Sequence, residues 1–288
     1  MGVIAMIGCG GIGSSLLPLV TRMMLNTETS RVESFLSGNS GCSERVGRLV
    51  LIDGDMYEAR NISRQQFPLS FVGMNKADAQ KEKLKVTLGL GERVVSVNEY
   101  ITPENVHRHL ENVEIVLSCV DNHRARWVVS QWAQSQRKKE KPFAVISGGN
   151  DKYDGNVHVH AYWSTRPGLT YKDIGEPIEK RHPEIMPNAT EGSREGLSCQ
   201  DVINMRGGEQ TMMANSMAAV VMFSAMFTLL TNTEAIANVQ DMYFDCINYR
   251  FNVIRAGETD GVKDLSFDAP LEDTPSGDDA SVTTPINN

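Results

Sequence analysis

The sequence has little of what marks secreted, disulfide-rich or zinc-ribbon proteins. Five cysteines among 288 residues are widely spaced, odd in number and include no Cys-x-x-Cys pair, which excludes a disulfide framework and a zinc ribbon. No signal-peptide pattern follows Met1. We therefore expect a protein of the reducing cytoplasm.

Clustered positive charge is also absent from the sequence. The formal net charge is -8, but the segment from Gly257 onward holds eight carboxylates against Lys263 alone and contributes -7 of it. The rest of the chain is therefore close to neutral. Because neutralisation of phosphates by Lys and Arg drives nucleic-acid binding, we expect no nucleic-acid partner.

One apolar stretch is long enough to raise the question of a membrane span. No residue between Thr211 and Thr233 is charged, and Met217 to Leu230 is mostly apolar. Polar residues interrupt the stretch, and it has neither an aromatic belt nor a basic flank. We favour a buried helix of the core or of a dimer interface and expect no membrane partner.

Strand and helix patterns alternate along the first half of the chain. Short apolar runs predict five strands, three helical patterns lie between them, and two later segments have the pattern of antiparallel strands. The strands are residues 3–7, 49–52, 94–97, 115–119 and 144–147, the last stopped by Gly148 and Gly149; the helical patterns are 16–24, 76–88 and 125–136; the antiparallel segments are 157–163 and 242–254. The patterns predict an α/β fold, with a Rossmann-like, mainly parallel sheet flanked by helices and continued by antiparallel strands.

Three segments have weaker patterns. Residues 27–47 are rich in Ser, Gly and Glu and predict an insertion loop or an irregular helix. Residues 166–206 predict a long crossover loop without secondary structure of its own. The acidic segment 257–288 holds too little apolar surface to offset its ordering entropy, so we expect one domain over 1–256 and a disordered tail over 257–288.

A glycine-rich motif follows the first strand and opens a helix. Gly8, Gly10, Gly11 and Gly13 stand in a G-x-G-x-x-G pattern, where backbone N–H groups and the helix dipole attract phosphate. The simplest ligand is NAD, with Asp53 on the ribose hydroxyls. Asp53 lies about twice the usual ~20 residues beyond the motif, although the insertion accounts for this. The glycines leave the ligand open between NAD and a mononucleotide.

Further motifs follow the second and fourth strands. Asp53-Gly-Asp55 ends the second strand, Asn61-Ile-Ser-Arg64-Gln65 follows, and Lys76-Ala77 opens the next helix. Asp121-Asn122, with Arg126, follows the fourth strand. In this order the motifs resemble those of the ThiF, MoeB and ubiquitin-activating enzyme superfamily, most closely from Val3 to about Gly149. Ser198-Cys199, Gln210, Asn215 and the long crossover resemble the PRTRC-type ThiF subgroup in particular.

The resemblance implies a ThiF-type adenylation domain over residues 1–256. Such a domain uses ATP and Mg²⁺ to adenylate the C-terminal carboxylate of a ubiquitin-like or sulfur-carrier protein with an exposed C-terminal tail. Attack of a carboxylate on the α-phosphorus joins two anions, so the site must supply positive charge and in-line positioning.

The resemblance also assigns roles to residues. Asp53 would hold the ribose hydroxyls, Asn61 and Arg64 the phosphates, Lys76 the phosphates near the reacting centre, and Asp121 the magnesium ion. Arg64, Lys76, Asp121 and Cys199 form the expected catalytic set. The other expected nucleotide contacts are Gly8, Gly10, Gly11, Gly13, Asp55, Gln65 and Asn122.

The cysteines receive different interpretations. Cys199 lies about where several family members place a cysteine that accepts the activated acyl group or sulfur, which requires a depressed thiol pKa. The alternative is an incidental cysteine, because some relatives stop at the adenylate. Cys9 and Cys119 fall in the glycine turn and a core strand, and we expect both to be small packing residues.

One departure from the family pattern concerns a second arginine. Close relatives carry a helix before the first strand, and its arginine reaches the ATP of the partner subunit in a homodimer. This chain begins at the strand, so either Arg22 or Arg31 replaces that arginine or the site works without it.

Other interpretations remain open from the sequence. A nucleotide-binding scaffold without turnover is the main alternative function, and an NAD-dependent oxidoreductase is less favoured. His158 and His160 share one face of an expected strand, and we favour ordinary half-buried histidines over metal ligands there.

Overall fold

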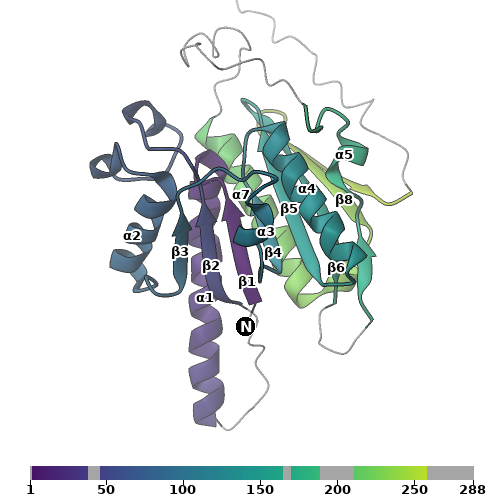
Figure 1. The fold of residues 1–288 in the computed structure, drawn as a ribbon, viewed down its shortest axis with the longest axis horizontal. Coiled ribbons are helices and arrows are strands. Elements are labelled where there is room, and N and C mark those ends of the chain that lie inside the picture. Colours follow the sequence, from purple (N-terminus) through teal and green to yellow (C-terminus); the bar gives the residue numbers. More distant parts are fainter. Residues whose placement is uncertain (1, 38–45, 165–169, 189–210, 258–288) are drawn as a thin grey trace, which may run out of the picture. The chain divides into compact units, whose positions relative to one another are not determined.

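The computed structural model describes residues 2–37, 46–164, 170–188 and 211–257, without the side chains of 26–37 and 46. Within these residues, nine strands form one sheet in the order β3-β2-β1-β4-β5-β6-β8-β9, and β7 pairs with β6 (Figure 1). The strands are β1 Gly2–Ile7, β2 Val46–Ile52, β3 Val94–Val97, β4 Ile115–Ser118, β5 Phe143–Asn150, β6 Asp154–Trp163, β7 Lys172–Ile174, β8 Val239–Asp245 and β9 Arg250–Arg255. The helices are α1 Gly11–Ser37, α2 Lys76–Leu88, α3 Val106–His109, α4 His123–Lys138, α5 Ile178–Arg181, α7 Met212–Thr231 and α8 Thr233–Ile236, with 3-10 turns η1 Ala59–Asn61 and η2 Leu69–Phe71.

The first five strands are parallel and the remaining pairs are antiparallel. All four residues of β4 and the last four of β1 are buried, as expected for strands covered on both faces. β1 lies between β2 and β4, so the chain runs from β1 to β2 toward one edge of the sheet and from β4 to β5 toward the other. Ligands bind at such a switch point, outside the carboxyl ends of the strands. The predicted α/β fold class is confirmed.

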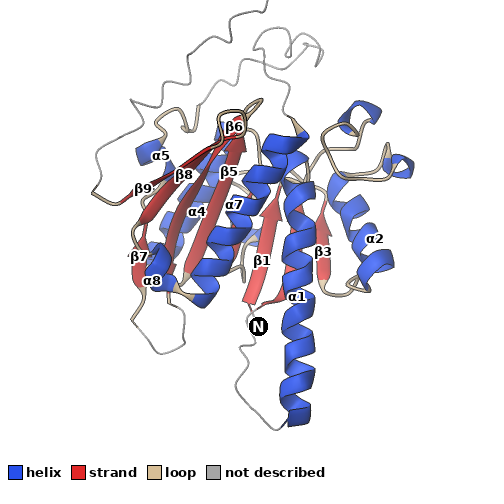
Figure 2. Ribbon diagram, turned by 180° about the vertical axis from the view of Figure 1, so that it is seen from behind, coloured by secondary structure: helices blue, strands red, loops and turns tan. Residues whose placement is uncertain are grey.

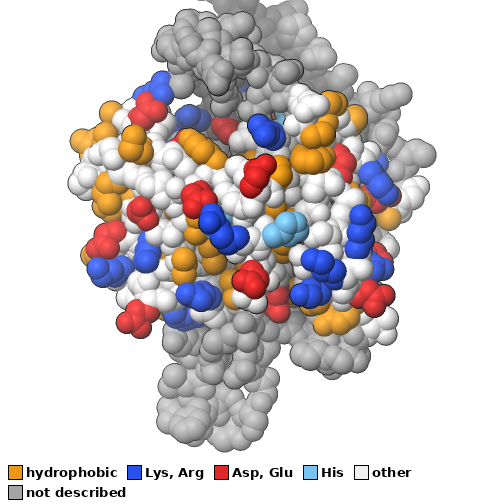
Figure 3. Space-filling model, in the orientation of Figure 1, with side chains coloured by type: hydrophobic (Ala, Val, Ile, Leu, Met, Phe, Trp, Pro, Cys, Tyr) orange, Lys and Arg blue, Asp and Glu red, His pale blue; other side chains and the backbone are white. Residues whose placement is uncertain are grey.

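Helices cover both faces of the sheet. Helices α1 and α7 lie on one face, and α3 and α4 lie on the other (Figures 1 and 2). Each pair closes a separate apolar core against the strands. On the α4 side the buried rings of Trp132 and Phe143 pack edge-to-face, with their centroids 6.4 Å apart. Figure 3 shows acidic and basic side chains intermingled on this side of the molecule.

Helix α7 is, among the described residues, the one helix long and apolar enough to cross a membrane by length and composition alone. In the structure it packs against α1, β5 and β6. Ala214, Ala218, Met222 and Ala225 are buried on this side, and Gly148 of β5 leaves the room that the Met222 sulfur occupies. The expected burial of this helix in the core is therefore confirmed for one of its faces.

Three local predictions differ from the structure. Helix α1 continues to Ser37, so much of the expected insertion is an extension of the first helix. Strand β5 runs through Gly148 and Gly149 to Asn150, because these residues pair with β6. The expected crossover loop contains β7 and α5, and its residues 166–169 and 189–206 lie outside the described residues.

The predicted domain boundary lies at the point where the chain divides into two units, Met1–Ala256 and Gly257–Asn288. The domain assignment stays a prediction. The predicted disorder of the tail falls on residues 258–288, which lie outside the described part of the chain. That prediction stays a prediction.

Candidate functional site

The glycine turn, residues 8–10, joins the carboxyl ends of β1, β2 and β4. The backbone N–H of Gly8 donates to the carbonyl of Ile52 at 2.9 Å, and that of Cys119 donates to the carbonyl of Ile7 at 2.7 Å. Gly8 has a φ of +91°, and a Cβ there would lie 2.7 Å from the Cys119 carbonyl oxygen. A Cβ on Gly13 would overlap the Gly8 carbonyl oxygen. Both glycines are therefore required by conformation or close approach.

Helix α1 begins at Gly11, directly after this turn. The first N–H groups of a helix have no intrahelical partners, and the helix dipole adds positive potential there. The start of α1 therefore offers the phosphate cradle that the motif predicts.

Asp53 at the end of β2 is hydrogen-bonded to the glycine turn. Its Oδ2 accepts the N–H of Cys9 at 2.6 Å, and its Oδ1 accepts the N–H of Asp55 at 2.9 Å. Burial raises the pKa of Asp53, while the positive charge of Lys76 and both backbone donors act against that rise. The carboxylate is thus held in one orientation beside the turn, where the ribose contact is predicted.

Lys76 is the first residue of α2 and lies beside the same turn. Its Nζ is 2.9 Å from Asp55 Oδ2, and the lysine side chain is 10% exposed against 49% for the aspartate. The Tyr100 hydroxyl also donates to Asp55, and its ring covers Gly54, where an added Cβ would lie 2.7 Å from it. This hydrogen bond, more than burial, raises the pKa of Tyr100 to about 12. Asp55 therefore accepts from both Lys76 and Tyr100.

Asn75 fixes the start of α2 against the end of β2. Its Nδ2 donates to the carbonyls of Asp53 and Asp55 at 2.7 and 3.0 Å. Its Oδ1 caps the helix by accepting the N–H groups of Ala77 and Asp78 at 2.9 and 3.1 Å. Asn75 and Tyr100 were not among the predicted site residues. Asn75 is of the residue type that caps helices, and Tyr100 lies just beyond the end of β3.

The segment after Asp55 folds back over the glycine turn. The Tyr57 hydroxyl donates to the Cys9 carbonyl at 3.1 Å, and its ring stacks on Phe67 with centroids 3.9 Å apart. The Gln66 N–H donates to Ser14 Oγ in α1 at 3.0 Å. These contacts hold residues 57–67 beside the turn.

Asn61, Arg64 and Gln65 belong to this segment. Asn61 is buried, and its Oδ1 accepts the Glu58 N–H at 3.0 Å, which closes η1. Arg64 is partly buried, and its carbonyl accepts from Asn215 Nδ2 of α7 at 3.3 Å. The structure therefore brings Gln65 beside Gly10 and joins the Arg64 carbonyl to the start of α7, while the Asn61 side chain shapes the segment that carries them.

Two buried polar atoms beside the turn have no hydrogen-bond partner within the described residues. They are Gln65 Oε1 and Asn215 Oδ1. Asn215 packs so closely on Gly11 that a Cβ there would overlap it, and Gln65 Nε2 lies 3.7 Å from where a Cβ on Gly10 would be. Because buried polar atoms are rarely left unpaired, these two indicate a polar ligand at the turn.

The motif after β4 combines an exposed carboxylate with structural contacts. Asp121 is exposed just beyond β4. Asn122 Oδ1 accepts the N–H of Ala125 at 2.6 Å and caps α4. Arg126 Nη2 donates to the carbonyls of Val120 and Gly148, both at 2.9 Å, and so ties the ends of β4 and β5 together. The predicted nucleotide contact of Asn122 stays a prediction.

The structure tests the predictions for two of the cysteines but not the one for Cys199. Cys9 and Cys119 are buried, and burial raises the pKa of both thiols, that of Cys119 to about 12, so the predicted packing role is confirmed. Cys199 lies outside the described residues, as does the side chain of Arg31. Arg22 is exposed on α1.

Several curated proteins are similar to part of this chain. Ubiquitin-like modifier-activating enzyme 5 of Oryza sativa subsp. japonica is 32% identical over 140 residues, which is 44% of this chain and 28% of that protein. The adenylyltransferase and sulfurtransferase UBA4 of Candida glabrata is 25% identical over 225 residues, 76% of this chain and 42% of that protein. The chain therefore spans less than half the length of these relatives.

Solved structures share the fold at low sequence identity. E. coli MccB with AMPCPP and MccA has a TM-score of 0.56 at 16% identity, covering 90% of this chain and 64% of that one. PaaA has a TM-score of 0.55 at 17% identity, covering 88% and 64%. The model of the ThiF family matches residues 3–261. The match spans nearly the whole chain, so the protein belongs to the ThiF family.

Proposed function

We propose that this protein is an adenylyltransferase that uses ATP and Mg²⁺ to activate the C-terminal carboxylate of a ubiquitin-like or sulfur-carrier protein. The observation that carries the proposal is the convergence of Asp53, Lys76 and the Asn61–Gln65 segment on the glycine turn. An NAD site would use the glycine turn and Asp53 but would give no role to the segment of residues 57–67, which contains Arg64.

The residues at the glycine turn fit a nucleoside triphosphate. The start of α1 favours anions, and Asp53 offers acceptors to ribose hydroxyls. Beside them, Gln65 and Asn215 each present a polar atom that has no hydrogen-bond partner within the described part of the chain. Each Asp53 oxygen already accepts one backbone N–H and retains a lone pair for a further donor.

Lys76 supplies the charge that the reaction needs. In adenylation a carboxylate oxygen forms a bond to the α-phosphorus while the bond from that phosphorus to pyrophosphate breaks, and negative charge accumulates on the phosphates. Lys76 lies beside the glycine turn at the capped end of α2, and it is the first proposed cation. Arg64 is the second. Phosphate competes with Asp55 for Lys76, and the Tyr100 hydroxyl keeps Asp55 hydrogen-bonded when Lys76 moves.

Asp121 is the residue proposed to hold magnesium. A hard cation that keeps water and phosphate ligands needs one or two protein carboxylates, and an exposed aspartate at the end of β4 satisfies this. When bound, the ion would screen phosphate charge. The protein's own part is to keep Asp121 at the strand end, through the contacts of Asn122 and Arg126.

The substrate class rests on the relatives. Their names describe activation of ubiquitin-like modifiers and adenylyl and sulfur transfer. For this chain we propose a carrier-protein substrate with an exposed C-terminal tail and, after adenylation, transfer of the activated group to Cys199. We also propose that the protein is a homodimer and is located in the cytoplasm.

Calorimetric titration with ATP and Mg²⁺, alongside NAD, tests the nucleotide site. We expect ATP binding that Asp53→Ala and Arg64→Ala each abolish, and no competing NAD binding. Tight NAD binding would contradict the proposal. ATP binding that Asp121→Ala leaves unchanged, together with no pyrophosphate release from any carrier, would instead indicate a nucleotide-binding scaffold.

A further inference from the structure

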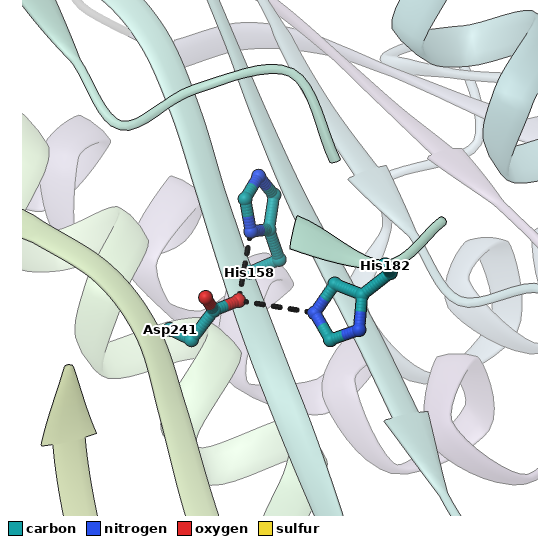
Figure 4. A group of neighbouring side chains, drawn as sticks. All are labelled: His158, His182 and Asp241. Atoms are coloured by element: carbon teal, nitrogen blue, oxygen red, sulfur yellow. Dashed lines mark hydrogen bonds and ion pairs between the residues drawn. The ribbon is translucent and has the colours of Figure 1, made fainter. Parts of the chain in front are cut away.

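A second cluster of polar side chains lies on the antiparallel half of the sheet. His158 of β6 and Asp241 of β8 are directly opposite each other in the strand register, and His182 follows α5 (Figure 4). None of the three belongs to the nucleotide site. His158 and Asp241 are fully buried, and the His182 side chain is 14% exposed.

Figure 4 shows both imidazoles directed at one carboxylate oxygen. His158 Nδ1 is 2.8 Å from Asp241 Oδ1, and His182 Nε2 is 3.3 Å from the same atom. The other carboxylate oxygen, Oδ2, accepts from Arg181 Nε at 3.1 Å. The ligating atoms of the three residues lie within 4.8 Å of one another.

The hydrogen bonds of His158 leave its Nδ1 facing a second acceptor. Its Nε2 is 2.8 Å from the carbonyl oxygen of Glu176, which only accepts, so Nε2 carries a hydrogen. In a neutral imidazole the Nδ1 atom is then a lone pair, and it faces Asp241 Oδ1, a second acceptor. Two acceptors 2.8 Å apart need a proton or a metal ion between them.

His182 also directs a ring nitrogen at Asp241. Its Nε2 faces the carboxylate, and its Nδ1 lies 3.5 Å from Glu184 Oε1. In metal sites each ligating histidine commonly donates its second ring N–H to a carbonyl or carboxylate, which fixes the tautomer. His158 has such an acceptor in the Glu176 carbonyl, and both histidines direct a nitrogen at one carboxylate oxygen.

We propose that His158 Nδ1, His182 Nε2 and Asp241 Oδ1 bind a divalent transition-metal ion, with zinc the best match. Two imidazoles and a carboxylate are zinc ligands, and bonds of about 2.0–2.1 Å in tetrahedral geometry separate ligand atoms by roughly 3.3 Å. The separation between His182 and Asp241 already has this value at 3.3 Å. The separation between His158 and Asp241 has to open by about 0.5 Å on binding.

Neighbouring side chains complete the site. Arg181 holds the second carboxylate oxygen, so Asp241 presents a single oxygen to the ion, and the carboxylate offsets the charge of the guanidinium. Asn156 Nδ2 lies 3.3 Å from His182 Nε2.

The ion would have a structural role. It would tie the segment that contains α5 to β6 and β8 through buried ligands from three elements. The histidine that the sequence pairs with His158 is not part of the site. His160 packs edge-on against Phe143, with ring centroids 5.0 Å apart, and burial lowers its pKa to about 4.

The test uses the full-length chain without an affinity tag, stripped with a chelator and titrated with ZnCl₂ in a calorimeter and with CoCl₂ in a spectrophotometer. We expect one ion per chain and the intense visible bands of tetrahedral cobalt. His182→Gln, at the most exposed ligand, and Asp241→Asn should each weaken binding by at least ~100-fold. His160→Gln is the matched control on the same strand and should bind as the wild type does.

Two results would overturn the proposal. One is that the wild-type chain binds neither zinc nor cobalt stoichiometrically, in which case a proton on His158 joins it to Asp241. The other is that His182→Gln leaves zinc binding unchanged. ATP titration of His182→Gln is a separate readout, expected to match the wild type, so failure of the metal site is distinguishable from failure of the nucleotide site.

Discussion

Replacing Lys76 by methionine separates the contribution of its charge from that of its packing. The lysine stem is almost fully buried, and methionine fills a similar volume, so the packing at the start of α2 is retained. What is lost is the ammonium group 2.9 Å from Asp55, which is the cation proposed to meet the phosphates.

The magnitudes differ for stability and for binding. Asp55 is half-exposed, so the ion pair contributes at most about 1 kcal/mol to the free energy of unfolding. That corresponds to a fall in Tm of roughly 2–4 °C for a domain of this size. A hydrogen bond to a charged group contributes about 1.5–3 kcal/mol, so ATP affinity should fall by roughly 10- to 150-fold.

Calorimetry with ATP and Mg²⁺, paired with thermal unfolding, measures both quantities. Lys85→Met is the matched control, since it removes the same charge from the same helix at a side chain that is 62% exposed. It should bind ATP as the wild type does. If Lys76→Met binds ATP within threefold of the wild type, as the control does, the role given to Lys76 is wrong.

Three further predictions follow from the same geometry. Gly13→Ala places a Cβ on a carbonyl oxygen of the turn, and it should lower the free energy of unfolding by about 3 kcal/mol or more, visible in thermal unfolding; an unchanged Tm would contradict the turn geometry. Cys9 and Cys119 have raised thiol pKa values and should resist iodoacetamide at pH 8 until the protein is unfolded, as peptide mass mapping would show; rapid native labelling of either would refute their burial. In the native protein the Tyr100 phenol should ionise only near pH 12, and Asp55→Asn should shift that ionisation toward pH 10, as followed by absorbance against a Tyr100→Phe reference.

The sign of the Tyr100 effect follows from linkage. Its folded pKa exceeds the unfolded value, so the hydrogen bond to Asp55 stabilises the fold fully below about pH 10. The stabilisation is lost as pH rises through about 12. Because Tyr100 is largely exposed, the effect on overall stability is small.

Much of the fold could be predicted from local sequence. Strand β3 and helix α2 were predicted with the bounds that the structure has, and β1, β2, β4 and α4 with ends that differ by one to three residues, because apolar runs and caps act over a few residues. The end of β5 was wrong, since glycines stop a strand only where no partner strand holds them. Here β6 pairs with Gly148 and Gly149.

In the candidate site, too, residues in short local motifs were predicted, and contacts between distant segments were not. Asp53 and the glycines were predicted because they follow strand ends within short motifs. Tyr100 contacts Asp55, and Asn215 packs on Gly11, only through the path of the whole chain. No local pattern predicts the contact of Tyr100, and Asn215 was named through the family resemblance alone. His158 and Asp241 are 83 residues apart, and only the register of β6 on β8 brings them together.

The exchange of labelled pyrophosphate into ATP tests the central claim most directly. The purified chain would be mixed with ATP, Mg²⁺ and a glycine-terminated ubiquitin-fold carrier protein, with the same carrier lacking its terminal glycine as the control. We predict label in ATP with the intact carrier, none with the shortened one, and none for Arg64→Ala or Asp121→Ala. No exchange with any of a panel of glycine-terminated carriers, from a chain that binds ATP, would contradict adenylation as its function.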